Sequence, residues 1–154
     1  MKSARLILGN GGLGRSKAGL VYGNLALQIG DVYFPDALWN DFAVVVLTSW
    51  CQGIVRLLLG ADSADIPFMD GPFSVNLSRV MGDVWRLSLI ETAPKQRMCR
   101  QEEIDAEPLI QSALDASALI LDKCREQKWW SAEADKLESA ARAVRAIEQS
   151  LRGH

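Results

Sequence analysis

The chain has 154 residues, a formal net charge of −2 and a sequence isoelectric point near 5.4. Apolar residues make up 49% and charged residues 23% of it, which is typical of a folded domain large enough to bury its own core. The weak acidic charge gives no electrostatic reason to expect nucleic acid or an anionic membrane surface as a partner.

The glycine-rich beginning of the chain contains G-x-G-x-x-G, the spacing of a dinucleotide-binding loop, starting at Gly9. Such a loop must lead into a helix, but Gly19 and Gly23 interrupt the residues that follow. The pattern is therefore a weak signal for a nucleotide site. We predict that residues 1–24 form a flexible glycine-rich segment and that a single α+β domain spans residues 25–154.

Two strands and a long helix are predicted next. Apolar residues alternate over 25–34, and Gly30-Asp31 indicates a two-residue hairpin turn of type II′. From 42 to 59 the pattern is that of a helix buried on most sides. Asn40 or Asp41 is expected to cap this helix, and the glycine within it, Gly53, is expected to allow another element to approach closely.

After the helix, Asp70-Gly71 predicts a second hairpin, and alternation around 73–78 and 85–90 completes an antiparallel meander of three strands. We interpret residues 94–107 as a polar loop. Helices to about residue 126 and from 131 onward are expected to pair as a hairpin. The predicted class is α+β, in the order β-β-α-β-β-β-α-α, with an antiparallel sheet of about five strands packed on a buried central helix.

The residues offer little for catalysis, because the only histidine is His154, at the end of the sequence. No histidine-based triad or histidine-ligated metal is expected, and a cysteine nucleophile would lack an activating base. Cys51 and Cys124 fall in apolar helical patterns and are interpreted as buried structural thiols. We expect no enzyme activity, cofactor or metal, although a pair of acids acting as acid and base stays open.

Tryptophans and acids are the candidate partner-binding residues. Trp50 and Trp85 are in phase with buried faces and are interpreted as core residues, whereas the other three lie at element boundaries, where half-exposed rings often anchor protein interfaces. The alternative is that these three close the ends of the core, and that the acids form a solvated charge run. The candidates are Trp39, Glu102, Glu103, Asp105, Glu107, Trp129 and Trp130.

Several short motifs resemble those of a family of small bacterial proteins of unknown biochemical role. They are Phe34-Pro35, the W-x-D-F motif at residues 39–42, Trp50 in an apolar helix, and F-M-D-G-P at residues 68–72. The resemblance covers roughly residues 30–126. The motifs are specific to a family but do not indicate a chemical activity. We interpret them as determinants of the fold: the end of a strand, a helix cap and a hairpin turn.

Proteins of this build are similar to bacterial immunity proteins, which bind and neutralise one toxin. The odd number of widely spaced cysteines and the lack of a recognisable targeting segment predict a cytoplasmic protein. The similarity implies a non-catalytic protein that acts by steric and electrostatic complementarity, often with acidic residues facing a basic toxin. Two alternatives stay open: a small-molecule or peptide-binding domain with its pocket between sheet and central helix, and a structural subunit that forms homo-oligomers.

Overall fold

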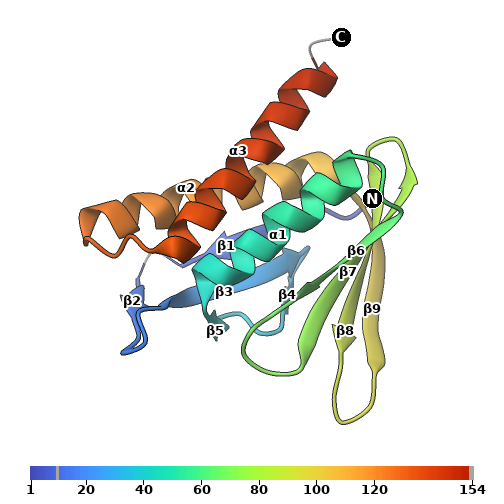
Figure 1. Ribbon diagram of the computed structural model, residues 1–154. Helices are drawn as coiled ribbons and strands as arrows, with labels where there is room; N and C mark the ends of the chain where they lie inside the picture. Colours follow the sequence, from blue (N-terminus) through green and yellow to red (C-terminus); the bar gives the residue numbers. More distant parts are fainter. Residues whose placement is uncertain (10, 153–154) are drawn as a thin grey trace.

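The computed structural model describes residues 1–9 and 11–152. Over this part of the chain it is α+β, with two antiparallel sheets and three helices (Figure 1). The predicted class and the order of the helices are confirmed. The strands outnumber those expected, and the single predicted sheet is two sheets: the strands before the central helix form one and those after it form the other.

The first sheet is built around β3 (Val21–Ile29), and β1 (Ala4–Leu8) pairs along most of its length. The predicted hairpin to β4 (Val32–Phe34) is confirmed. Its turn has φ +57° at Gly30, the left-handed conformation that the first central residue of a type II′ turn requires. Two short strands, β2 (Gly14–Arg15) and β5 (Asn40–Asp41), complete the sheet at the beginning of β3.

The start of the chain differs from the prediction, because strands β1, β2 and the first part of β3 all lie within residues 1–24. Ala4 and Leu6 are buried in the core. The boundary predicted at residue 25 is therefore wrong: the first sheet begins at residue 4. The element after β1 is a strand and not a helix, so the described residues lack the helix that a dinucleotide-binding loop needs.

The second sheet has the order β6 (Ser63–Pro67), β7 (Phe73–Met81), β8 (Val84–Glu91), β9 (Arg97–Asp105). The three-stranded meander is confirmed. The predicted loop over 94–107 is wrong, because β9 pairs with β8 along its whole length. Ile104 is the one fully buried residue of β9. A strand with so few apolar residues has no alternating pattern to reveal it, and backbone pairing at the sheet edge stabilises it instead.

The helices are α1 (Ala43–Leu58), α2 (Ala106–Glu126) and α3 (Ala132–Arg152). α1 lies between the sheets and contacts both β3 and β6, while α2 packs on β1. Trp50 on α1 and Trp85 on β8 are 0% and 3% exposed, so the prediction that both are core residues is confirmed. At Gly53 a Cβ would lie 3.1 Å from the side chain of Ile66, which confirms the predicted close approach.

α3 follows α2 after a short turn, but its main neighbour is α1 and not α2 (Figure 1). Ser131 caps α3 as predicted, because its hydroxyl accepts the backbone N–H of Ala134 at 3.3 Å. Leu137 and Val144 are fully buried. The seam predicted to pack against α2 therefore packs chiefly against α1, since α1 offers a wider apolar surface.

Candidate functional site

The two recognisable motifs meet at a buried carboxylate, that of Asp41, which is 3% exposed. It accepts the backbone N–H of Phe42 at 2.7 Å and the indole N–H of Trp39 at 3.0 Å, both within W-x-D-F. It also accepts the backbone N–H groups of Met69 and Asp70, at 3.1 and 3.2 Å, from F-M-D-G-P. One side chain therefore ties the start of α1 to the turn between the strands of the second sheet. We call this region the motif junction.

Aromatic contacts complete the motif junction. Phe34 makes edge-to-face contacts with Phe68 and Phe73, and Trp39 makes one with Phe73 at 5.3 Å between ring centroids. At Gly71, φ is +77° and a Cβ would lie 3.0 Å from the Trp39 ring. The motifs are thus fold determinants, as their sequence suggests.

The predicted cap of α1 needs a correction. The N-cap position is Phe42, and no side chain caps the helix there. Asp41 accepts the N–H of Phe42, and its remaining hydrogen bonds come from the Trp39 indole and from the Met69–Asp70 turn. Asn40 is exposed and lies on β5.

The acidic candidates lie on β9 and at the start of α2, and several have basic partners. Glu102 pairs with Arg100 at 2.9 Å, and Glu103 pairs with Arg86 across the sheet at 3.5 Å. Asp105 is the N-cap of α2 and accepts the backbone N–H of Glu107 at 3.3 Å. Only Asp105 and the Glu107 that follows it line a pocket, described below.

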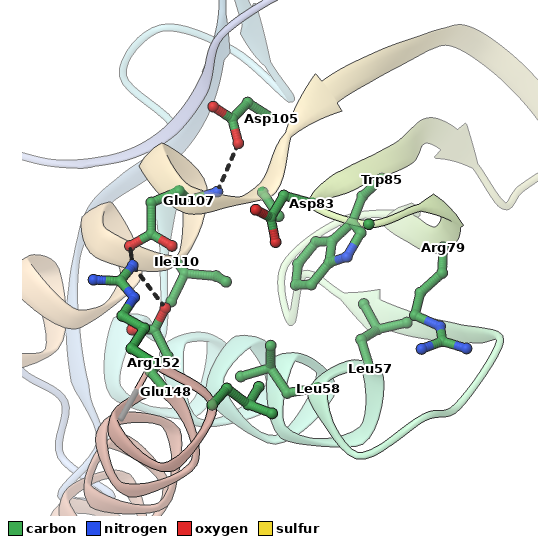
Figure 2. Close-up of a pocket in the computed structure, with 13 residues that line it drawn as sticks. Leu57, Leu58, Arg79, Asp83, Trp85, Asp105, Glu107, Ile110, Glu148 and Arg152 are labelled. Carbon is green, nitrogen blue, oxygen red and sulfur yellow. Dashed lines mark hydrogen bonds and ion pairs between the residues drawn. The ribbon is translucent and has the colours of Figure 1, made fainter. Parts of the chain in front are cut away.

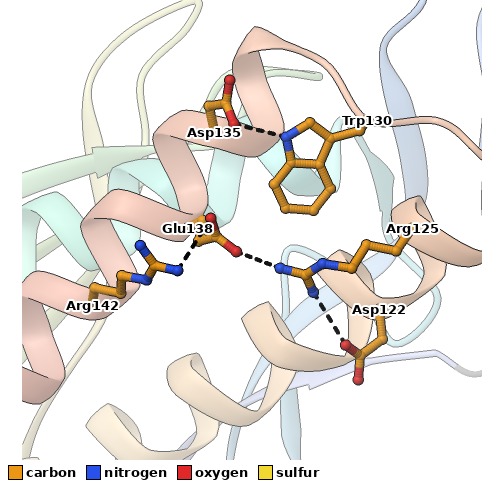
Figure 3. Close-up of polar contacts among 6 residues, drawn as sticks. All are labelled: Asp122, Arg125, Trp130, Asp135, Glu138 and Arg142. Atoms are coloured by element: carbon orange, nitrogen blue, oxygen red, sulfur yellow. Dashed lines mark hydrogen bonds and ion pairs between the residues drawn. The ribbon is translucent and has the colours of Figure 1, made fainter.

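Trp129 and Trp130 lie at the turn between α2 and α3, where both are half-buried against the core. The indole N–H of Trp130 donates to Asp135 at 2.7 Å, and the Arg125 guanidinium lies 4.6 Å from its ring centroid (Figure 3). Arg125 also pairs with Glu138 on α3. These contacts connect the two helices and favour the alternative in which the ring closes one end of the core.

The candidate residues therefore do not form one surface. Asp105 and Trp129 flank the two ends of α2, which has 21 residues. At 1.5 Å per residue the helix is about 30 Å long. Trp39 lies in the motif junction, directly before β5, which leads into α1. That these residues bind a partner stays a prediction.

A pocket of about 640 Å³ lies where α1 and α3 end, α2 begins and β7 turns into β8 (Figure 2). We call it the end pocket. Leu57, Leu58, Trp85 and Ile110 give it apolar walls. Its charged lining consists of the carboxylates of Asp83, Asp105, Glu107 and Glu148 and the guanidinium groups of Arg79 and Arg152.

The charged groups on one side of the end pocket are coupled. Arg152 pairs with Glu107 and lies 3.6 Å from Glu148. Burial raises the pKa of Glu148, the neighbouring Glu107 raises it further, and Arg152 opposes the rise. A single cation therefore serves two neighbouring carboxylates at the pocket wall.

The Trp85 side chain faces the end pocket although only 3% of the residue is exposed (Figure 2). Among the described residues its indole N–H has no hydrogen-bond partner, whereas those of Trp39 and Trp130 are bonded to carboxylates. The one fully enclosed side-chain polar atom without a partner among the described residues is the indole nitrogen of Trp50. The Trp85 N–H is therefore open to the end pocket, where a ligand or water can accept its hydrogen bond.

Large exposed apolar side chains lie in the lining of the end pocket or next along the chain to its lining residues. Leu59 follows α1, Val80 and Met81 lie at the β7–β8 turn, and Leu151 lines the pocket mouth. Their exposed fractions are 71%, 39%, 75% and 58%. Sequence reasoning missed this site because its residues come from six separate elements and form no motif. The one available signal was the Gly82-Asp83 turn between two apolar residues.

The cysteines agree with the sequence interpretation. Cys51 and Cys124 are buried, and Cys99 on β9 is exposed. Burial raises the pKa of Cys51 to about 11, with its contact to the Ser117 hydroxyl lowering it slightly. Among the described residues no three histidine, cysteine or acidic side chains gather as metal ligands, and none of the described helices is long and apolar enough to cross a membrane.

No family model matches the chain, and no curated protein and no solved structure matches it either.

Proposed function

We propose that the protein is a non-catalytic, immunity-type protein that neutralises a bacterial toxin by binding it directly, and that the toxin docks over the end pocket. The observation that carries this proposal is a charged pocket with one exposed leucine in its lining and further exposed apolar side chains next along the chain to its lining residues. Leu59, Met81 and Leu151 are each more than half exposed. Exposed methionine and leucine around a recess are unfavourable in water and are characteristic of protein interfaces.

The charge of the pocket supports a basic partner. Its lining holds four carboxylates and two guanidinium groups, and two helix C-termini, which favour cations, meet one N-terminus there. Toxins that bind nucleic acid carry basic surfaces, and such a surface would be complementary to this lining.

The test begins with capture of partners by the tagged protein from the cell in which it is made. Each recovered protein is then expressed alone, and growth is measured with and without this chain. We expect one recovered protein to be toxic alone, and co-expression of the wild-type chain to restore growth. A partner that is harmless when expressed alone would contradict the proposal.

A small-molecule binding protein is the second candidate, favoured by the unpaired indole N–H of Trp85 inside a pocket of about 640 Å³. Native mass spectrometry of the purified chain distinguishes the two. An adduct of one defined mass that is lost on Trp85→Phe substitution would favour the small molecule over the toxin.

A further inference from the structure

We propose that the end pocket is a subsite for an arginine side chain of the partner protein, and this inference rests on the proposed function. The chain itself shows what the pocket wall binds. The guanidinium of Arg152 pairs with Glu107 and lies 3.6 Å from Glu148. A guanidinium is planar and presents several N–H donors at once, so it suits two neighbouring carboxylates better than an ammonium does.

The Arg152 guanidinium can be displaced from the two carboxylates of this wall. Arg152 lies in the last described turn of α3, and its side chain is 61% exposed. An exposed ion pair of this kind contributes little to stability, because solvent screens it. The two carboxylates are less exposed, with side-chain values of 43% for Glu107 and 13% for Glu148. A guanidinium that enters the pocket from a partner would be more desolvated than that of Arg152, which strengthens its attraction to the acids.

The remaining walls fit the rest of an arginine residue. Leu57, Trp85 and Ile110 can cover the three methylene groups of its stem. Asp83 and Asp105 add negative charge at the same mouth, and Arg79 is the one other cation among the described lining residues. The Trp85 indole N–H is open to the pocket, and the backbone carbonyl of the bound arginine is one group that could accept its hydrogen bond in place of water. A ligand with both a guanidinium and a peptide carbonyl satisfies both features.

The test uses the indole N–H signals of the five tryptophans, observed by two-dimensional NMR of the ¹⁵N-labelled full chain. N-acetyl-arginine amide is titrated into wild type, Arg152→Gln and Arg142→Gln. Arg142→Gln is the matched control, because it removes the same charge from the same helix at an exposed position, paired to Glu138 and not to the pocket. Trp85→Phe assigns the reporter signal, and the fully buried Trp50 reports that each variant stays folded.

We expect the Trp85 signal to move on titration, with a Kd at least tenfold lower in Arg152→Gln than in wild type or Arg142→Gln. Adding Glu107→Gln and Glu148→Gln to Arg152→Gln should abolish the response. A Trp85 signal that does not move in folded Arg152→Gln would overturn the inference. Equally tight binding of N-acetyl-lysine amide would also overturn it, because the site would then not require a guanidinium. Equally tight binding of N-acetyl-citrulline amide would overturn it as well, because the site would then not require a positive charge.

The two proposals fail separately. A chain that binds the arginine amide but restores growth against no recovered partner keeps the subsite and loses the immunity function. A chain that neutralises a toxin without any response at Trp85 keeps the function and loses the subsite.

Discussion

The motif junction and the end pocket differ in how completely their polar groups are satisfied. In the junction, the buried Asp41 carboxylate accepts four N–H groups, and the indole of Trp39 is bonded. In the end pocket, the indole N–H of Trp85 has no acceptor among the described residues and is open to the pocket, and burial raises the pKa of Glu148. A polar network in which every group has a hydrogen-bond partner stabilises the fold, whereas polar groups without a protein partner are available to a ligand. The motifs visible in the sequence therefore report structure, and the candidate site has no motif.

Asp41→Ala should have the largest effect, because it leaves buried N–H donors of two segments without their acceptor. We expect a loss of about 3 kcal/mol or more in the free energy of unfolding, measured by urea denaturation. The matched control is Asp36→Ala, which removes an exposed carboxylate bonded only to the neighbouring Ala37 N–H. If both variants lost the same free energy of unfolding, the Asp41 carboxylate would not be what holds the two segments of the motif junction together.

Two glycines with positive φ, one in the motif junction and one in the end pocket, allow the packing of the two regions to be compared. A Cβ on Gly71 would lie 3.0 Å from Trp39, whereas one on Gly82, beside the end pocket, would meet nothing within 4 Å. Both alanine variants incur the strain of a left-handed residue, about 1 kcal/mol each, and Gly71→Ala adds the contact with the ring. We expect Gly71→Ala to be the less stable in thermal unfolding. Equal melting temperatures would show that the junction is looser than its contacts imply.

The smallest effect concerns pH and the Glu148 carboxyl. Its pKa is raised in the folded chain by burial and by Glu107, so the folded state binds its proton more tightly than the unfolded state does. The stability that this group contributes is therefore complete below its ordinary pKa of 4.5 and is lost as pH rises through the raised value. The Glu148→Gln variant has no ionisable group at this position, so its stability lacks this dependence on pH.

We expect the stability of wild type relative to Glu148→Gln to fall as pH rises from about 4 toward 7, measured by urea denaturation at each pH. Glu138→Gln, which alters an acid paired to Arg142 and Arg125 away from the pocket, is the control. A difference that rises with pH would mean that Arg152, and not burial, dominates at Glu148.

Much of the fold was predictable, because hydrophobic period and turn residues specify it locally. Gly30, Asp70-Gly71 and the apolar run of α1 each signal one element, and each element is where the pattern places it. β9 was not predictable, since its stability comes from pairing with β8 and not from its own side chains. β1 was hidden because glycines follow it, although Ala4 and Leu6 are in the core.

The candidate site was predictable only in fragments. Asp105 and Glu107 were identified as acids of interest, but their neighbours Asp83, Glu148 and Arg152 come from a turn and from the far end of α3. No spacing along the chain connects these residues, because tertiary packing of α3 on α1 brings them together. The sequence also could not show whether Trp39, Trp129 and Trp130 lie near the acids, because it does not contain the distances between them.

The most direct test compares Met81→Asp with Leu38→Asp against a recovered toxin. The two side chains are equally exposed, at 75% and 78%, but Met81 lies beside the end pocket and Leu38 beside Trp39 in the motif junction. The proposal predicts that Met81→Asp weakens toxin binding at least tenfold, about 1.4 kcal/mol, and no longer restores growth, while Leu38→Asp binds like wild type. Loss of binding in Leu38→Asp with normal binding by Met81→Asp would contradict the proposal and move the interface to the motif junction.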